Sequence, residues 1–501
     1  MTTDTGETYL GIDAGTSVVK AAVFDASGNA LAVQGKPVDL VHGEDGAVEQ
    51  DLDAIHAGML EVAKAAIAES GTVPGSIALT GQGDGCWLTD EEFRAVRPAL
   101  SWLDGRAAKL IDEWTADGVV EQVFRTSGGT MFPGAPAALL KWLDLNEPET
   151  LDRAASAGYV KDALFGRLTG VRATDPSDSS MPLGDGTGFG YSDNTLEITG
   201  LSHRKDLLAP IVAPVPVGEL RDDPAQALGL PPGTPVTSGP FDFPACGFGG
   251  GIAWPGTEGD ALLIVGTTLG CLVHLDELIT DGEPGGFSVS TGQPGQWLRA
   301  MPAMVGTASL DWLLRLLGAG VKEVQEALAA SPPCANGVSM LPYLATAGER
   351  APFVDPLAAG QISGLRLTTD RNDLIRAICE GLAYTARHCF EAAGRTGRIV
   401  VAGGGTGSSA WMQVFADVLE IPLQLARNPE VGARGAVLAG AAARGAPLDV
   451  EAWTSPEGVV EPDPANRTLY DDGFGHQMQL LEAARPTWRG RAALARPRKK
   501  R

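Results

Sequence analysis

The 501-residue chain lacks several features, and each absence excludes a class of protein. No apolar run reaches the roughly 18 residues that a membrane-spanning helix needs. The polar, acidic first eight residues lack the apolar core of a signal peptide. The six cysteines and six histidines are scattered without the spacing of metal ligands. These absences predict a cytoplasmic protein with reduced core thiols, no membrane partner and no structural metal cluster.

Positive charge is also scarce, because 38 Lys and Arg residues stand against 62 Asp and Glu residues and leave a net charge of −24. General nucleic-acid binding needs a basic face, so no nucleic-acid partner is expected. The one basic block lies at the end of the chain, and residues 491–501 are interpreted as a solvated tail. Composition does not decide the oligomeric state, and a homodimer remains an open alternative.

What the chain does have is an ordinary globular composition, with 44% hydrophobic and 20% charged residues. Helical periodicity covers residues 52–69 and 371–392, and short buried strands are expected at 76–80 and 398–402. Strands that alternate with helices predict an α/β protein. The Ser-, Asp- and Gly-rich residues 175–195 are interpreted as irregular surface with turns.

A Pro- and Gly-rich stretch at 231–240 precedes a Gly-rich segment at 241–251 and indicates a domain junction near 248–260. The predicted domains are residues 1–250 and 251–490, followed by the tail at 491–501.

The most informative pattern is a hairpin that occurs twice. Residues 9–25 and 261–276 each contain two apolar runs joined by a Gly-Thr turn. Glycine lets backbone approach a ligand closely, and the exposed N–H groups of such a turn attract phosphate oxygens. A single hairpin of this kind is most often only a hairpin. The pair, with Asp13 and Lys20 across the first turn, predicts a phosphotransferase that holds a nucleotide between two related domains.

A third Gly-rich loop, at 403–409, lies between an expected strand and an expected helix. Free N–H groups and the helix dipole favour a nucleotide there. The loop is not a P-loop and does not have the dinucleotide-binding spacing. A strand-to-helix turn without a ligand is the alternative, and the two hairpins favour an adenosine site.

Several polar residues are candidates for acceptor chemistry. Asp242 is placed in a Gly- and Pro-flanked turn near the junction, where a carboxylate could take a proton from an attacking hydroxyl. Gln82 and Asp84 follow a buried strand and could bind the hydroxyls of a polyol, or could simply form a Gly-rich turn. Trp102 and Asp104, with the neighbouring arginine, either line the acceptor site or form packing and an ion pair.

In this order and spacing the motifs resemble those of the FGGY family of carbohydrate kinases over nearly the whole chain. The first hairpin is similar to the family's first phosphate motif, and Gly266-Thr-Thr268 to its second. The motifs that carry the rest of the resemblance are Gly81-Gln-Gly-Asp-Gly85, Trp102-Leu-Asp-Gly-Arg106, Asp242, Leu341-Pro-Tyr-Leu344, Gly348-Glu-Arg-Ala-Pro352, Gly403-Gly-Gly-Thr-Gly-Ser408 and Glu430 with Gly435 and Ala436.

The resemblance implies two ribonuclease-H-like α/β domains of the actin and sugar-kinase superfold around a nucleotide cleft. It also implies transfer of the γ-phosphoryl group of ATP to a sugar or polyol with Mg²⁺. Asp242 would be the catalytic base, Asp13 would hold Mg²⁺ or its waters, and the acceptor would contact Gln82, Asp84, Trp102, Asp104, Asp242 and Phe243. The nucleotide would contact Thr16, Ser17, Lys20, Gly266, Thr267, Thr307, Gly404, Gly405 and Ser408.

Departures from the family pattern bear on the acceptor. This chain has Gln82-Gly-Asp-Gly85 in its substrate segment. Many pentulose kinases have a motif similar to Gln-Met-His-Gly there, and glycerol kinases have one similar to Gln-Arg-Glu-Thr. The acid at position 84 is typical of a polyol reader, whereas the missing arginine at position 83 disfavours glycerol. Phe243 replaces a polar residue of many relatives with an apolar wall. An erythritol-type kinase is the leading prediction. A xylulose or ribulose kinase and an actin-like ATP-binding switch are the alternatives.

Overall fold

The computed structural model describes residues 7–346, 348–427 and 430–492. Contacts between Cα atoms group these residues into two compact units. Unit 1 comprises residues 7–258, 274–299, 427 and 430–455, and unit 2 comprises 259–273, 300–346, 348–426 and 456–492. The sequence boundary between residues 250 and 251 stays a prediction. The contact grouping differs from it because 430–455, assigned by sequence to the second domain, packs with the first unit.

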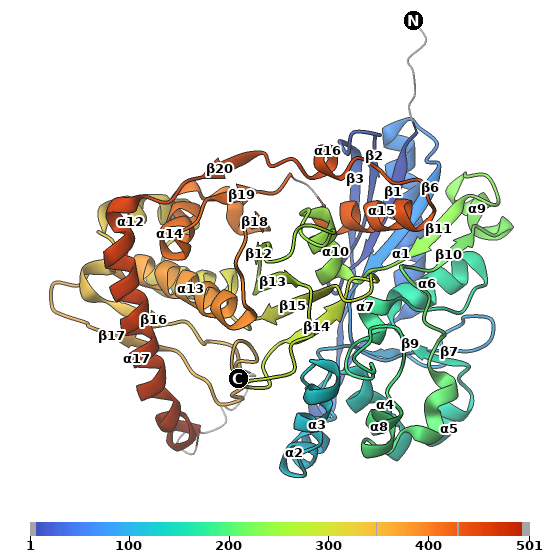
Figure 1. Ribbon diagram of the computed structural model, residues 1–501, viewed down its shortest axis with the longest axis horizontal. Coiled ribbons are helices and arrows are strands. Elements are labelled where there is room, and N and C mark those ends of the chain that lie inside the picture. The colour runs from blue at the N-terminus through green and yellow to red at the C-terminus, as the bar shows by residue number, and fades with distance from the viewer. Residues whose placement is uncertain (1–6, 347, 428–429, 493–501) are drawn as a thin grey trace, which may run out of the picture. The chain divides into compact units, whose positions relative to one another are not determined.

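A six-stranded sheet forms the centre of unit 1 (Figure 1). Its strand order is β10-β11-β6-β1-β2-β3. The predicted first hairpin is β1 with β2, which pair antiparallel, and β6 and β11 then add in parallel beside β1. The sheet strands are β1 (Tyr9–Ala14), β2 (Val18–Phe24), β3 (Ala30–Pro37), β6 (Ser76–Gly81), β10 (Val217–Glu219) and β11 (Pro235–Ser238).

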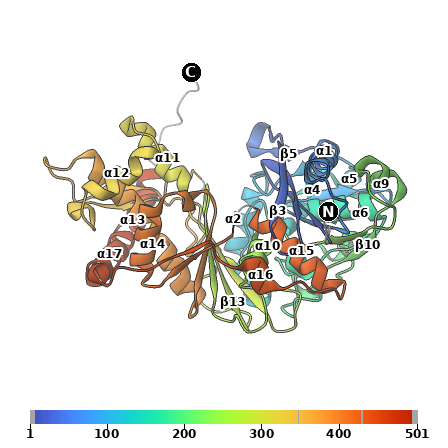
Figure 2. The same ribbon diagram turned by 90° about the horizontal axis from the view of Figure 1, so that it is seen from above.

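The alternation of side chains along β1 explains why helices cover both faces of this sheet. Leu10 and Ile12 point to one face and join the apolar cluster of α1 (Leu52–Ser70). Tyr9 faces the other way and joins the cluster of α15 (Val431–Ala443). Figures 1 and 2 show these two helices on opposite sides of the strands.

Small residues let α15 pack closely against β1 and the helix α10 (Asp242–Gly249) within unit 1. A Cβ on Gly11 would lie 2.8 Å from the Ala433 carbonyl oxygen, and one on Gly435 would lie 1.8 Å from that of Ala245. A larger side chain at either position would push α15 away from the sheet or from α10. Glu430, Gly435 and Ala436 were recognised as a motif, but nothing in the sequence indicated which surface this helix covers.

The rest of unit 1 consists of short elements around this sheet. Its remaining strands are β4 (Val41–His42), β5 (Val48–Gln50), β7 (Trp87–Thr89), β8 (Ala99–Leu100), β9 (Ser156–Gly158) and β14 (Phe287–Ser290). Its remaining helices are α2 (Ala108–Ala116), α3 (Val119–Ser127), α4 (Pro136–Asn146), α5 (Pro148–Asp152), α6 (Val160–Thr169), α7 (Pro176–Ser179), α8 (Asp193–Ile198), α9 (Asp222–Leu228) and α16 (Val450–Thr454).

Unit 2 repeats the strand pattern of unit 1. The second predicted hairpin is β12 (Ala261–Val265) with β13 (Leu269–Leu275), and β18 (Ile399–Ala402) and β19 (Leu423–Leu425) add in parallel beside β12. An antiparallel edge strand, β20 (Gly458–Val460), follows as β10 does in unit 1. The repeat confirms the predicted α/β fold of two related halves.

The helices of unit 2 pack around α13 (Arg371–Ala393), which contacts α11, α12 and α14. Asp370 and Asp373 form a capping box at its start, and Gly394 ends it at φ +79°. The other elements are α11 (Thr307–Leu317), α12 (Lys322–Ala330), α14 (Ser409–Leu419), α17 (Arg467–Ala492), β15 (Trp297–Pro302), which spans the unit boundary, and the hairpin β16 (Ser339–Leu341) with β17 (Gln361–Ser363).

Two sequence interpretations of local structure were wrong. Residues 241–251 do not form a Gly- and Pro-rich turn, because Asp242–Gly249 is the helix α10. Residues 175–184 are not irregular surface, because nearly all of them are buried and 176–179 form α7. The predicted tail lies outside the described residues from 493 onward. Among the residues that the structure describes, no helix is long and apolar enough to cross a membrane.

Candidate active site

Two carboxylates that the sequence singled out, Asp13 and Asp84, act on a third, Asp242, in unit 1. Asp13 ends β1 and lies opposite Lys20 in the β1–β2 register, and Asp242 is the first residue of α10. Burial, together with the charges of Asp13 and Asp84, raises the pKa of Asp242 to about 8, and the hydrogen bond from the Phe243 N–H opposes this rise. Burial likewise raises the pKa of Asp13 to about 6, with Lys20 opposing the shift.

The start of α15 lies against Asp13 and α10. A Cβ on Gly432 would lie 3.7 Å from Asp13 Oδ2 and 3.5 Å from Cys246 Sγ, one turn after Asp242 on α10. Asp13 Oδ1 is buried and has no hydrogen-bond partner in the part of the chain that the structure describes. A buried carboxylate oxygen without a donor is suited to a cation or to an ordered water.

The loop that carries Gln82 and Asp84 packs directly on the segment that precedes Asp242. A Cβ on Gly83 would lie 2.6 Å from the Phe241 ring, so only glycine fits at this position. Asp84 follows with φ +56°, a left-handed conformation that aspartate tolerates better than most residues. The arginine that is absent at position 83 therefore could not be restored without moving Phe241.

Thr16, Gln82 and Trp102 share one hydrogen-bond network. Thr16 Oγ1 donates to Gln82 Oε1 over 3.0 Å, and Trp102 Nε1 donates to Thr16 Oγ1 over 2.9 Å. Gln82 is only 2% exposed and donates to Gln50 Oε1, while Gln50 Nε2 donates to the Thr16 carbonyl. The structure thus brings a predicted phosphate contact and two predicted acceptor contacts together. Gln50 was missed, because it carries no recognisable motif.

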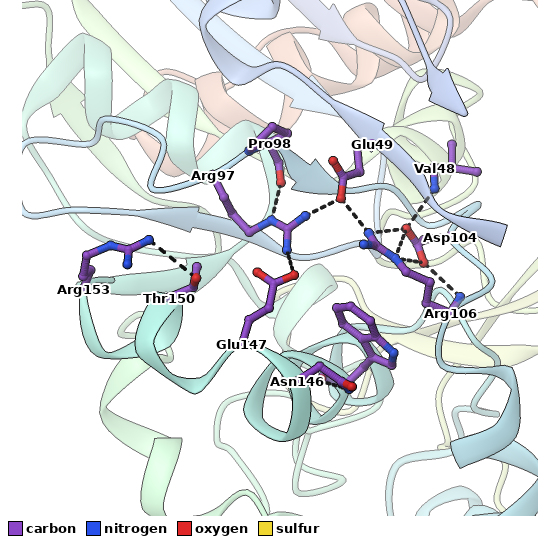
Figure 3. Close-up of polar contacts among 11 residues, drawn as sticks. Val48, Glu49, Arg97, Pro98, Asp104, Arg106, Asn146, Glu147, Thr150 and Arg153 are labelled. Carbon is purple, nitrogen blue, oxygen red and sulfur yellow. Dashed lines mark hydrogen bonds and ion pairs between the residues drawn. The ribbon is translucent and has the colours of Figure 1, made fainter. Parts of the chain in front are cut away.

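Asp104 lies in a different network, which Figure 3 shows. Its carboxylate accepts hydrogen bonds from the Val48 N–H and from the Arg106 backbone and guanidinium. Arg106 and Arg97 both bind Glu49, and Arg97 also binds Glu147. These contacts fix the turn that carries Trp102, and they favour the ion-pair alternative for Asp104 over direct contact with an acceptor.

The remaining unit 1 candidates occupy the first hairpin and α10. Lys20 Nζ is paired with Glu430 at 3.1 Å, and Glu430 is the residue that precedes α15. Ser17 is exposed on the β1–β2 turn. Phe243 forms an edge contact with Phe287 of β14, with ring centroids 6.3 Å apart. Glu430 belongs to a motif that the sequence analysis recognised, but its pairing with Lys20 was not predicted.

In unit 2 the predicted nucleotide contacts converge through backbone. The Thr307 N–H at the start of α11 donates to the Gly266 carbonyl over 2.9 Å, and the Ala308 N–H donates to that of Thr267. Gly403 has φ +100°, and a Cβ there would lie 2.6 Å from the Val265 carbonyl oxygen. The 403–409 loop is therefore held against the end of β12, immediately beside Gly266.

This loop presents backbone rather than side chains. Gly404 is exposed, and a Cβ there would meet no described atom within 4 Å, whereas a Cβ on Gly405 would lie 2.3 Å from Val265 Cγ1. The Ser408 hydroxyl accepts a hydrogen bond from the Trp411 N–H and caps α14.

A buried carboxylate that the sequence analysis did not single out fixes the segment before Thr307. Glu349 accepts hydrogen bonds from the Met304 and Arg350 N–H groups at 2.7 and 3.0 Å, and burial raises its pKa to about 7. Its motif was recognised, but the bond to the Met304 N–H, 45 residues away in the sequence, could not be predicted.

Comparison with known proteins identifies the family. Residues 8–249 match the model of the N-terminal domain of the FGGY family of carbohydrate kinases, and residues 261–444 match its C-terminal domain. The chain is 32% identical to an erythritol kinase of Brucella abortus (strain 2308) over 516 residues, covering 96% of this chain and 97% of that relative. It is 30% identical to a xylulose kinase of Escherichia coli (strain K12), covering 85% and 87% of the two chains.

The fold agrees with solved structures. A ligand-bound xylulose kinase from Lactobacillus acidophilus superposes with a TM-score of 0.90 at 21% identity, covering 96% of this chain and 99% of that chain. The match at this identity concerns the fold alone, whereas the two domain models and the relatives concern the family. The chain belongs to the FGGY family of carbohydrate kinases, and it is an ATP-dependent sugar kinase with a two-domain α/β fold.

Proposed function

We propose that this kinase transfers the γ-phosphoryl group of ATP to a hydroxyl of a small polyol, with erythritol as the leading acceptor and Asp242 as the general base. The observation that carries the proposal is that Asp242, the first residue of α10, lies close enough to Asp13 and Asp84 in unit 1 for their charges to raise its pKa. A base with a pKa of about 8 is matched to proton removal near neutral pH. The proton of the attacking hydroxyl passes to the Asp242 carboxylate as its oxygen forms the new ester bond to the γ-phosphorus, and the bond from that phosphorus to the bridging oxygen breaks and releases ADP.

The surroundings of Asp13 fit a magnesium ion. Mg²⁺ prefers oxygen ligands and is commonly held in kinases by one or two carboxylates together with substrate phosphates. The unpartnered, buried Oδ1 of Asp13 is such a ligand, and the described residues contain no larger cluster that could hold a metal. When bound, Mg²⁺ neutralises charge on the phosphates. Without the ion, the negative charge of Asp13 is one of the causes that raise the pKa of Asp242.

The acceptor preference is supported by residues on the Gly81–Gly85 loop and by one apolar wall. Asp84 and Gln82 offer oxygen and amide groups that can bind several hydroxyls of a polyol. Phe243 packs on Phe287 and offers no hydrogen bond. Many family members have a polar residue at the corresponding position. The erythritol kinase relative, at 32% identity over nearly the full length, points to the same acceptor class.

The nucleotide contacts form the other part of the proposal. Thr16, Ser17 and Lys20 of the first hairpin and Gly266, Thr267 and Thr307 of unit 2 are proposed to bind phosphates. Gly404, Gly405 and Ser408 are proposed to border the adenosine, because their loop offers exposed backbone beside the β12 end. Trp102, which is oriented by its hydrogen bond to Thr16, is proposed to line the acceptor site. Asp104 is proposed to hold the turn that carries Trp102 through its hydrogen bond from the Val48 N–H.

A pentulose kinase is the second candidate, because several relatives are xylulose kinases. Gly83 and Asp84 distinguish this chain from that candidate, because many pentulose kinases have Met-His at the corresponding positions. An actin-like switch without an acceptor is disfavoured by membership of a carbohydrate kinase family.

The test is an ADP-release assay with Mg-ATP across erythritol, threitol, ribitol, glycerol, xylulose and ribulose. We expect the highest kcat/KM for a tetritol. Activity confined to the ketopentoses would overturn the acceptor assignment and leave the kinase assignment intact. ATP binding without stimulation by any acceptor would contradict both.

A further inference from the structure

A buried cluster of four charged residues lies outside the proposed site in unit 1. Lys161 of α6 is 0% exposed, and its Nζ lies 2.7 Å from Asp162 Oδ1, 2.8 Å from Asp175 Oδ1 and 3.0 Å from Asp178 Oδ2. We name these residues the Lys161 cluster. Buried charges are tolerated only when they are closely paired, so loss of one partner would leave an uncompensated charge in the interior. None of the four residues belongs to a motif that the sequence analysis assigned to the site.

The Lys161 cluster fixes the position of the short helix α7. Asp175 and Asp178 bind Lys161 from the start and the interior of this helix. The second oxygen of Asp175 accepts the Ser177 N–H at 2.9 Å and so caps the helix. The Tyr159 hydroxyl, from the residue before α6, donates to the Asp178 carbonyl over 3.0 Å. Three contacts, two from Lys161 and one from Tyr159, therefore hold α7 to the start of α6.

α7 in turn contacts the segment that leads into α10. The Phe241 N–H donates to Ser177 Oγ over 3.1 Å, and Phe241 is the residue immediately before Asp242. The Asp175 side chain packs on Gly239, where a Cβ would lie 2.7 Å from Asp175 Cγ. On the other side, Thr80 Oγ1 donates to the Pro240 carbonyl over 2.7 Å. The three residues before Asp242 are thus held by α7 and by the end of β6.

We propose that the Lys161 cluster places the Asp242 carboxylate, with Ser177 as the positioning residue that transmits the placement. Ser177 does not touch the acceptor in this account. It sets the backbone position at which α10 begins, and thereby the reach of its first side chain. The inference rests on the proposed role of Asp242 as the base. Displacing a base by about 1 Å is enough to lower turnover strongly.

The chain offers a matched control on the same helix. Ser179 is as buried as Ser177, at 1% exposure each, but its hydroxyl has no hydrogen-bond partner among the residues that the structure describes. Ser177→Ala and Ser179→Ala therefore remove the same atom from the same helix, and only the first removes the bond to the Phe241 N–H. Ser177→Cys keeps the shape of serine and weakens the acceptor.

The experiment measures kcat, the KM for ATP and the Tm of these variants in the full-length enzyme with its best acceptor. We expect Ser177→Ala to lower kcat by about tenfold with the KM for ATP unchanged. Ser177→Cys should fall between Ser177→Ala and the wild type, and Ser179→Ala should retain wild-type kcat. Equal kcat for Ser177→Ala and Ser179→Ala would overturn the proposal. If Ser177→Ala does not fold, the comparison of Ser177→Cys with Ser179→Ala decides in the same way.

A double-mutant cycle separates this inference from the assignment of Asp242. If Ser177 acts through the Asp242 carboxylate, Ser177→Ala should have little further effect on kcat in an Asp242→Asn background. The same tenfold loss in both backgrounds would show a general structural effect and contradict the positioning role. Wild-type kcat in Asp242→Asn alone would instead refute the base assignment.

Discussion

The two units repeat one strand pattern, yet they present different chemistry at the ends of their strands. Unit 1 gathers side chains there: the carboxylates of Asp13, Asp84 and Asp242 and the network of Thr16, Gln82 and Trp102. Unit 2 instead presents backbone groups there. The glycines at 403 and 405 lie close to the end of β12, and the Gly266 carbonyl accepts a hydrogen bond from the Thr307 N–H. The contrast fits a division in which unit 1 recognises the variable acceptor in addition to nucleotide phosphates, whereas unit 2 binds the invariant nucleotide.

The physical reason lies in the two ligands. Backbone N–H groups bind phosphate oxygens whatever the surrounding side chains are, so a glycine-built site is suited to a ligand that does not change. Hydroxyls of an acceptor differ in number and orientation, and only side chains can be exchanged to match them. Substitutions in the two units should therefore affect different kinetic constants.

The largest effect is expected in unit 1. Asp242→Asn keeps the shape of the side chain and removes the base, so kcat should fall by about 10² to 10⁴-fold with the KM for ATP nearly unchanged. Steady-state ADP release at saturating ATP measures this. A kcat within threefold of the wild type would contradict the role of Asp242.

The pH dependence of turnover follows from the same carboxylate. Because burial, together with Asp13 and Asp84, raises the pKa of Asp242 to about 8, the base is protonated at lower pH. We expect kcat/KM for the acceptor to fall about tenfold for each pH unit below this pKa. A profile between pH 6 and 9 checks the slope. The acidic limb should be absent in Asp242→Asn, and its persistence there would assign the limb to another group.

In unit 2 the expected effect is on nucleotide binding and stability. Gly403→Ala introduces a Cβ 2.6 Å from the Val265 carbonyl oxygen at φ +100°, which should destabilise the fold by about 1–3 kcal/mol and raise the KM for ATP. Thermal unfolding and ATP titration measure both. Gly407→Ala is the matched control for stability, because a Cβ there would meet no described atom within 4 Å. An equal Tm for the two variants would contradict the account of the loop.

The smallest effect is expected on acceptor choice. Phe243→Asn restores a polar group opposite Phe287 and should shift the ratio of kcat/KM between a ketopentose and a tetritol several-fold toward the ketopentose. The ratio is measured with both acceptors on one enzyme preparation, which cancels differences in active fraction. A ratio that does not change would remove Phe243 from the specificity account.

Much of this arrangement could be predicted from the sequence, because it depends on local patterns. The Gly-Thr hairpins are β1–β2 and β12–β13, and the periodic segment at 52–69 is α1. The role of Asp242 stays a prediction, and the turn predicted around it was wrong. Pro and Gly around it indicated a turn, whereas Pro244 falls in the first turn of α10, where a missing N–H does no harm.

The features that could not be predicted depend on contacts between distant residues. The Ser- and Asp-rich residues near 175–180 have the composition of a surface loop, but two of their carboxylates are paired with the buried Lys161. The pairing of Lys20 with Glu430 joins residues 410 positions apart. No local period or motif encodes such partners, so the environment of the candidate site had to come from the structure.

The measurement that tests the division between the units most directly is the pair of KM values of Asp84→Asn. Asparagine tolerates the left-handed backbone at this position, so the variant changes the charge and leaves the loop in place. The account predicts that the KM for the preferred polyol rises more than tenfold while the KM for ATP stays within twofold. A raised KM for ATP with an unchanged KM for the polyol would contradict it.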